Sequence, residues 1–192
     1  MTRAARLALL FCAPLLLAAT NADQFIGSPP DATLDEAAYR ARLHDALGGD
    51  AAAQLDMARA ARRAGNDETA ADWLRRAAGQ GLPAAQGELA VLLATGRGTE
   101  PDPPRAAVLA RRAADAGNVV GQRVLGALFA RGLGVEQSWD DALRWSRLAA
   151  EQGDGAAQAN LADVLRRQGA VDAGGTRGGR TPRPGAPRPL GQ

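Results

Sequence analysis

Several residue types that carry chemistry are missing or rare in this sequence of 192 residues. It has no lysine, one cysteine (Cys12) and one histidine (His44). A single histidine cannot form a histidine-based metal site, so His44 is interpreted as a solvated or helix-capping residue. We therefore expect no metal and no cofactor.

Aromatic residues are also scarce, at 4% of the sequence, whereas alanine dominates the 46% of residues that are hydrophobic. Alanine has the highest helix propensity, and strands favour the aromatic and β-branched residues that are few here. This composition predicts an all-α protein in which small side chains let neighbouring helices pack closely.

The serines and carboxylates do not form a catalytic pattern. Ser138 is placed as a helix cap and Ser146 falls within a helix, so neither lies in the strained turn of a hydrolase nucleophile. Asp140 and Asp141 fall in the first turn of the same helix, where the helix dipole favours negative charge. We therefore predict that the protein is not an enzyme.

The N-terminus has the pattern of a secretory signal peptide. Arg3 and Arg6 precede an apolar run over residues 7–19, and small residues follow up to Ala22. The apolar run is shorter than the roughly 20 residues that a membrane-spanning helix needs. We predict cleavage after Ala22 and a periplasmic or secreted protein that is not an integral membrane protein, with a retained anchor as the alternative.

Cleavage at this site removes Cys12, the one cysteine in the sequence. Phe11 precedes it, whereas a lipoprotein cleavage site requires a small residue at that position, so lipid attachment is not expected. The mature chain then has no thiol for a disulfide or for thiol catalysis. Packing alone must stabilise its fold.

All 23 basic residues are arginine, and they are unevenly distributed. Residues 23–172 hold seventeen arginines and twenty-one acidic residues, a formal charge of −4, while the last twenty residues hold four arginines and no acid. The pI near 9.4 therefore describes the precursor rather than the body of the protein. An acidic body is a poor match to a nucleic-acid-binding domain, which needs a basic face.

A motif near the middle of the chain recurs twice at a fixed spacing. Residues 73–81 (WLRRAAGQG) return at 109–117 (LARRAADAG) and at 145–153 (WSRLAAEQG), each 36 residues after the previous copy. A repeat of this length indicates a solenoid, in which each unit buries its apolar face on a neighbour. The first unit is four residues shorter, and the missing residues are expected in its inter-helix loop. The glycine loops at 96–98 and 132–134 are expected to turn one helix into the next.

The chain divides into five segments by composition. The signal peptide, 1–22, is followed by a polar linker, 23–32, an N-terminal capping helix, 33–48, and the solenoid, 49–170. Residues 171–192 are rich in glycine, proline and arginine and have too few apolar residues to offset the entropy cost of ordering, so a disordered tail is predicted.

Apolar and small residues recur at helical spacing within the solenoid. Trp73, Leu109 and Trp145 share one register, so both tryptophans are interpreted as core residues. Each repeat unit is expected to consist of a first and a second helix. Gly121 and Gly126 fall within the first helix of one unit, where each costs about 1 kcal/mol of helix propensity relative to alanine. We therefore expect two helices to cross closely at these glycines.

Three registered motifs carry a family resemblance: the 36-residue Trp-x-x-x-Ala-Ala-x-x-Gly stretch, the run Gly121–Phe129 (GQRVLGALF) and the loop Gly132–Val135 (GLGV). Over about residues 49–168 the chain resembles the Sel-like repeat family, a relative of the tetratricopeptide repeat. Leu109 departs from the aromatic residue usual in that family. The resemblance implies a right-handed α/α superhelix of about three to four antiparallel helix pairs. It also implies binding of proteins or peptides, often as a scaffold or regulator at the bacterial cell envelope.

A tetratricopeptide-like stack would line its inner groove with the first helices. Leu89, Leu125 and Leu161 recur at one register of the first helices and form an apolar ladder. The positions two before and two after each of these leucines, the equivalent positions of the first unit, and arginines one turn beyond include the candidate binding residues Leu55, Arg59, Arg62, Val91, Arg123, Asp163 and Arg166. Because arginine pairs bidentately with carboxylates, we expect a groove for an extended partner segment that carries carboxylates. The alternative is that these residues form solvated helix faces.

These observations predict a non-enzymatic protein–protein interaction module of the bacterial cell envelope, with a protein or peptide partner. The alternative is a cell-wall enzyme or enzyme accessory that holds glycan or peptide on the same solenoid, which an acid pair converging in the groove would favour. Nucleic-acid binding through the arginine-rich tail is poorly compatible with export.

Overall fold

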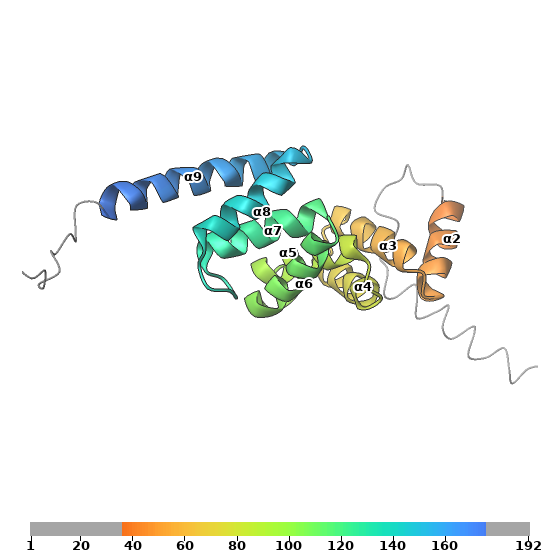
Figure 1. Cartoon of the computed structure of the whole chain (residues 1–192). Coiled ribbons are helices and arrows are strands. Elements are labelled where there is room, and N and C mark those ends of the chain that lie inside the picture. The colour runs from red at the N-terminus through yellow and green to blue at the C-terminus, as the bar shows by residue number, and fades with distance from the viewer. Residues whose placement is uncertain (1–35, 176–192) are drawn as a thin grey trace, which may run out of the picture.

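The computed structural model describes residues 36–175, and this part of the chain consists of helices joined by short loops (Figure 1). No strand occurs within the described range, which confirms the all-α prediction. The helices are α2 (Glu36–Leu47), α3 (Ala51–Arg63), α4 (Asp67–Gly79), α5 (Pro83–Thr95), α6 (Pro103–Asp115), α7 (Val119–Arg131), α8 (Trp139–Glu151) and α9 (Gly155–Gly175).

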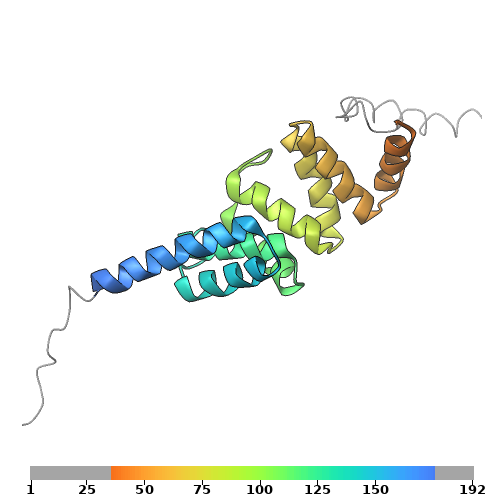
Figure 2. The same cartoon turned by 90° about the horizontal axis from the view of Figure 1, so that it is seen from above.

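Successive helices form pairs, and the pairs stack into a solenoid (Figures 1 and 2). Helix α3 packs on α4, α5 on α6 and α7 on α8, so each repeat unit is one pair. The first helices of neighbouring units also touch, α5 with α7 and α7 with α9. Helix α9 therefore occupies the place of a fourth first helix.

Helix α2 covers the N-terminal end of the stack by packing on α3. Tyr39 and Leu43 lie against the core, and burial raises the pKa of the Tyr39 hydroxyl. Arg42 forms an ion pair with Asp56 of α3. The first residues of the predicted capping helix, 33–35, lie outside the described residues.

Short polar side chains begin most of the helices. The Asp50 carboxylate accepts a hydrogen bond from the Ala53 N–H over 2.6 Å, and Ser138 caps α8 in the same way, as predicted. Each cap satisfies an N–H that has no partner inside the helix. The remaining side-chain caps are Asn66, Asp102, Asn118 and Asp154.

The core is built from alanine and a few large side chains. Trp73 and Trp145 are buried, which confirms that both belong to the core. The ladder leucines Leu89 and Leu125 are also buried, at the same register in consecutive units. The repeat spacing therefore reports the same packed position in each unit.

Close helix packing at the predicted glycines is confirmed. A Cβ at Gly121 would lie 2.5 Å from the Ala113 Cβ and 2.7 Å from the Ala114 backbone nitrogen. A Cβ at Gly126 would lie 2.6 Å from the Ser146 Oγ. Helix α7 thus approaches α6 and α8 through residues without side chains.

The longer inter-helix loops rest on the preceding unit. Gly98 has a φ of 65°, and a Cβ there would lie 2.1 Å from the carbonyl oxygen of Asp67, at the start of α4. Gly134 sits in the same way against Pro103, at the start of α6. The loop of the first unit, between α3 and α4, is shorter, as predicted.

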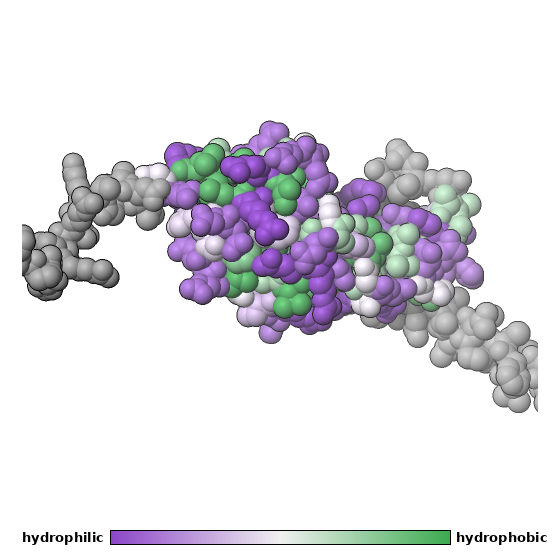
Figure 3. Space-filling model, in the orientation of Figure 1, coloured by the Kyte–Doolittle hydropathy of each residue, from purple (hydrophilic) through white to green (hydrophobic). Residues whose placement is uncertain are grey.

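Helix α9 continues to Gly175, beyond Gln168 where the first-helix pattern ends. In Figure 3, hydrophobic residues are visible along the middle of α9, on a face that is mostly hydrophilic. Within residues 36–175, no helix is long and apolar enough to cross a membrane. The predicted signal peptide and linker, and the tail from residue 176, lie outside the described residues.

Candidate functional site

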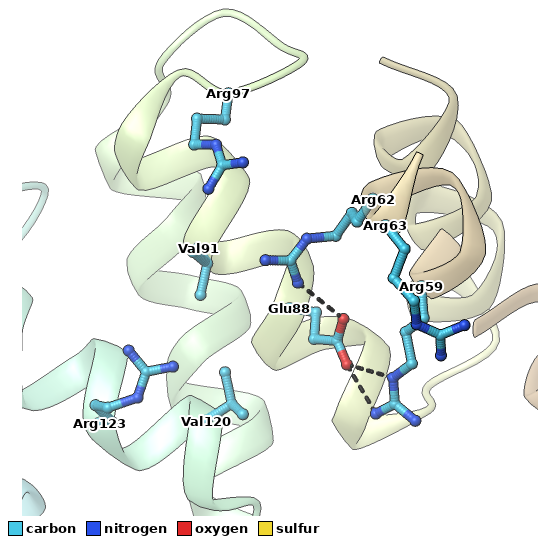
Figure 4. Close-up of a pocket in the computed structure, with 8 residues that line it drawn as sticks. All are labelled: Arg59, Arg62, Arg63, Glu88, Val91, Arg97, Val120 and Arg123. Carbon is cyan, nitrogen blue, oxygen red and sulfur yellow. Dashed lines mark hydrogen bonds and ion pairs between the residues drawn. The ribbon is translucent and has the colours of Figure 1, made fainter. Parts of the chain in front are cut away.

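A hollow of about 490 Å³ lies across α3, α5 and α7, the first helices of the three repeat units (Figure 4). Five of its eight lining side chains are arginines, and one is a carboxylate. We call it the arginine hollow. Its lining residues are Arg59, Arg62, Arg63, Glu88, Val91, Arg97, Val120 and Arg123.

Glu88 of α5 holds two arginines of α3 in place. The Arg59 Nε donates to Glu88 Oε1 over 2.8 Å, and its Nη2 lies 2.7 Å from the same oxygen. The Arg62 Nη1 donates to Glu88 Oε2 over 3.3 Å. The Glu88 side chain is only 10% exposed, so this carboxylate fixes two guanidinium groups at the edge of the hollow.

Two further arginines are held by acids from neighbouring elements. Arg97, in the loop after α5, pairs with Asp67 at the start of α4 over 2.9 Å. The Arg123 Nε of α7 donates over 3.1 Å to Asp154, which also caps α9. The Arg97–Asp67 contact joins two repeat units, and the Arg123–Asp154 contact joins α7 to the start of α9. The arginines around the hollow are therefore positioned by the stacking of the units.

The two valines supply apolar surface between the arginines. Val91 lies on α5 and Val120 in the first turn of α7, and Figure 4 shows both between Glu88 and Arg123. At Gly87 a Cβ would lie 2.6 Å from the Asn118 Oδ1, which lets α7 begin close to α5. The hollow thus combines a short apolar patch with several guanidinium donors.

The structure brings together four of the seven predicted binding residues. Arg59, Arg62, Val91 and Arg123 all line the arginine hollow. Leu55, however, is 6% exposed and belongs to the hydrophobic core, so it does not line the hollow.

The last two predicted residues lie elsewhere. Asp163 and Arg166 are on α9, where they form an ion pair with one another at 3.8 Å. Asp163 lines a separate small hollow between α7 and α9. Neither residue lines the arginine hollow, because α9 stacks one unit beyond α7.

The counting rule missed Arg63, Glu88, Arg97 and Val120. Glu88 aligns in the repeat with Val124, and Arg97 aligns with Leu133, so neither charge recurs in the next unit. The run Arg62-Arg63 at the end of α3 was the one available signal for Arg63. A rule based on repeated positions cannot find residues that only one unit carries.

The arrangement suits binding rather than catalysis. Guanidinium groups donate in a planar fork that matches carboxylates, and they do not act as general acids or bases near neutral pH. Within the described residues, no group of three histidine, cysteine or acidic side chains is placed to hold a metal. The hollow has one carboxylate, Glu88, so it lacks the acid pair that glycoside hydrolysis requires.

A second hollow lies at the loop between α7 and α8 and is acidic. Glu136, Asp140 and Asp141 line it together with Trp139. Asp141 accepts a hydrogen bond from the Ser138 hydroxyl, and both aspartates are in the first turn of α8. Helix capping and the helix dipole account for this cluster.

The repeat units match a known family. Residues 51–82, 83–118 and 119–154 each match the Sel1 repeat. The chain belongs to the Sel1 repeat family. Proteins built from Sel1 repeats generally mediate protein–protein interactions, and the helical repeat fold described above agrees with this membership.

Solved Sel1 repeat structures resemble this one. A Sel1 repeat protein from Oxalobacter formigenes is 36% identical, with a TM-score of 0.55 over 65% of this chain and 96% of that chain. A protective antigen of uropathogenic Escherichia coli with an SLR fold is 32% identical, with a TM-score of 0.57; the match covers 65% of this chain and 28% of the antigen.

A more distant structure shares the fold alone. The cysteine rich protein B of Helicobacter pylori is 14% identical, with a TM-score of 0.52 over 67% of this chain and 98% of that chain. No curated protein sequence matches this Sel1 repeat chain.

Proposed function

We propose that this Sel1 repeat protein is a non-enzymatic interaction module of the bacterial cell envelope that binds an extended, acidic segment of a partner protein in the arginine hollow. The observation that carries the proposal is the convergence of five arginines from three consecutive units around one hollow with a single carboxylate. The envelope location rests on the predicted signal peptide.

Several guanidinium donors remain for a ligand after the internal ion pairs are formed. Each guanidinium carries five N–H donors, and Arg123 uses only its Nε on Asp154. Arg62 donates to Glu88 through its Nη1, and its guanidinium carries a second terminal nitrogen, Nη2. An acidic ligand can therefore add hydrogen bonds without breaking the pairs that hold the arginines.

The shape of the site favours an extended segment over a compact ligand. The lining residues come from α3, α5, the loop after α5, and α7, which belong to three consecutive units, so a segment that crosses the hollow meets one unit after another. Carboxylates spaced along such a segment would pair first with Arg59 and Arg62 and then with Arg123. Val91 and Val120 would receive an apolar side chain between them.

The test is recovery of partners from the native envelope fraction by immobilised wild-type chain and by a double variant, Arg59→Ala with Arg123→Ala. The matched control is Arg105→Ala with Arg147→Ala, which removes the same charge from exposed positions on α6 and α8. We expect the hollow variant to lose a protein partner that the wild type and the control retain.

Unchanged recovery by the hollow variant would remove the arginine hollow as the binding site. Recovery of peptidoglycan fragments alone, by wild type and control, would favour the alternative of a cell-wall accessory protein. A synthetic peptide of alternating aspartate and glycine, compared with its asparagine counterpart, measures the carboxylate preference directly. Equal binding of the two peptides would contradict the proposed partner chemistry.

A further inference from the structure

One face of α9 is exposed where the equivalent faces of the earlier first helices are buried. Leu165 aligns with Leu93 and Phe129, which are both buried, yet Leu165 is 49% exposed. Ala162 aligns with the buried Ala90 and Gly126, and it is exposed as well. The pattern extends to Gln158, which is exposed although Gln54, Gln86 and Gln122 are buried.

The missing cover is a second helix. Helices α4, α6 and α8 cover this face on α3, α5 and α7. By the 36-residue spacing from α8, the next second helix would span about residues 175–187, which contain three prolines and four glycines. Proline is disfavoured within a helix and glycine has low helix propensity. The composition of these residues therefore does not favour a helix of this kind.

Helix α9 itself carries the sequence of a second helix. Its residues 162–167 read ADVLRR, and residues 71–76 of α4 read ADWLRR. Both segments form the same ion pair between an aspartate and an arginine three residues later. In α4 the alanine and the leucine of this motif, Ala71 and Leu74, are fully buried in its unit. The corresponding residues of α9 are Ala162 and Leu165.

We propose that two copies of this chain pair through α9, each α9 serving as the second helix for the other copy. The pair has two-fold symmetry, so the same face is used twice. A two-fold axis perpendicular to the helices makes them antiparallel, the relation expected for the two helices of one repeat unit. Leu165 of one copy then lies beside the small Ala162 of its partner, and the reverse contact follows by symmetry.

The charge and shape of α9 agree with this pairing. Leu161, Ala162 and Leu165 follow one side of the helix without a charged residue among them. Asp163 pairs with both Arg166 and Arg167 within its own helix, which offsets part of their positive charge toward a second copy. Figures 1 and 2 show α9 running past α7 and α8, so a second copy can lie along it.

The surface is separate from the arginine hollow. The hollow is lined by α3, α5, α7 and the loop after α5, and no residue of α9 contributes to it. Self-association and peptide binding can therefore be measured independently. Failure of one of these two proposals would therefore not imply failure of the other.

The experiment is sedimentation equilibrium over a concentration series, on protein expressed from the full sequence. We expect wild-type chain to approach twice the monomer mass as concentration rises. Leu165→Arg places a charge in the centre of the paired face, so this variant should sediment with the mass of a monomer at every concentration. Ala162→Glu, at the point of closest approach, should have the same effect. Circular dichroism checks that both variants keep the helical fold.

The matched control is Leu148→Arg. Leu148 is 37% exposed and aligns with Arg76 and Arg112, so the fold already accepts arginine at this position in two units. This variant should dimerise like the wild type. A wild type that remains monomeric throughout would overturn the proposal, as would a dimer that survives in both Leu165→Arg and Ala162→Glu. Dissociation of the Leu148→Arg control would also overturn it, because the interface would then lie on α8.

Discussion

The Arg59 Nε of α3 donates to the Glu88 Oε1 of α5 over 2.8 Å, across the boundary between the first two repeat units. The same carboxylate accepts from Arg62, so one acidic residue both joins two units and lowers the positive charge of the hollow. The stability of the stack and the affinity of the hollow for acids are therefore coupled through Glu88.

Glu88→Gln should separate these two effects. Loss of the carboxylate should lower the free energy of unfolding by about 1 kcal/mol, a modest amount because Arg59 is partly exposed to solvent. It should also tighten binding of an acidic peptide, because the hollow gains one positive charge. Urea unfolding and calorimetric titration measure the two quantities.

The control for this change is Asp72→Asn. Asp72 pairs with Arg75 on the exposed surface of α4, outside the hollow. Asp72→Asn should change both the free energy of unfolding and the affinity for the acidic peptide only slightly. Weaker peptide binding by Glu88→Gln would mean that Glu88 orients the arginines more than it opposes the ligand charge.

Gly121→Ala should destabilise the fold by about 1–3 kcal/mol, since the new methyl group overlaps Ala113 and the backbone of Ala114. This cost exceeds the gain in helix propensity of about 1 kcal/mol. Gly79→Ala is the matched control, because a Cβ at Gly79 meets nothing within 4 Å. Thermal or urea unfolding of the two variants should shift in opposite directions; a stabilised Gly121→Ala would show that α6 and α7 can move apart freely.

Ser146→Ala should be neutral or stabilise the protein by up to about 1 kcal/mol. The Ser146 hydroxyl is fully buried and has no hydrogen-bond partner, so its removal relieves the cost of burying an unpaired polar group. The equivalent residue of the preceding unit is Ala110. The unfolding midpoint in urea tests the prediction, and a clear loss of stability would indicate that the hydroxyl is hydrogen-bonded in solution.

Binding of an acidic peptide to the hollow should weaken steeply with salt. The Debye length falls from about 10 Å at 0.1 M to about 3 Å at 1 M, and the arginines lie at an open surface. We expect the dissociation constant of the alternating aspartate peptide to rise several-fold over this range. An affinity independent of salt would indicate that Val91 and Val120, rather than the arginines, dominate the contact.

The fold was predictable because the same pattern of residue types recurs in three units. A tryptophan or leucine at one register, followed by alanines and a glycine, defines each second helix, and the leucine ladder defines each first helix. Agreement between units separates a packed position from a chance apolar residue. The capping roles of Asn118 and Asp154 were missed, although each stands directly before a repeated first helix.

The site was only partly predictable because it depends on differences between units. Arg59, Arg62 and Arg123 were found by counting from repeated positions, but Glu88, the partner of Arg59 and Arg62, has no charged counterpart at Val124. Leu55 shares the register of Gly87 and Arg123, yet it is buried in the hydrophobic core. Local neighbours, rather than the repeat pattern, decide which side chains reach the hollow.

The loops that follow α5 and α7 each fit against the start of the second helix one unit earlier, through Gly98 and Gly134. The contact has a direction, because each unit carries the loop that docks on its predecessor. Duplication of a whole 36-residue segment would therefore supply the new unit with its own docking loop. The array could therefore grow by tandem copying with this loop contact kept in each new unit. A copy of the first unit inserted between later units would carry the short loop, so the second helix before it would lose the loop contact at its start.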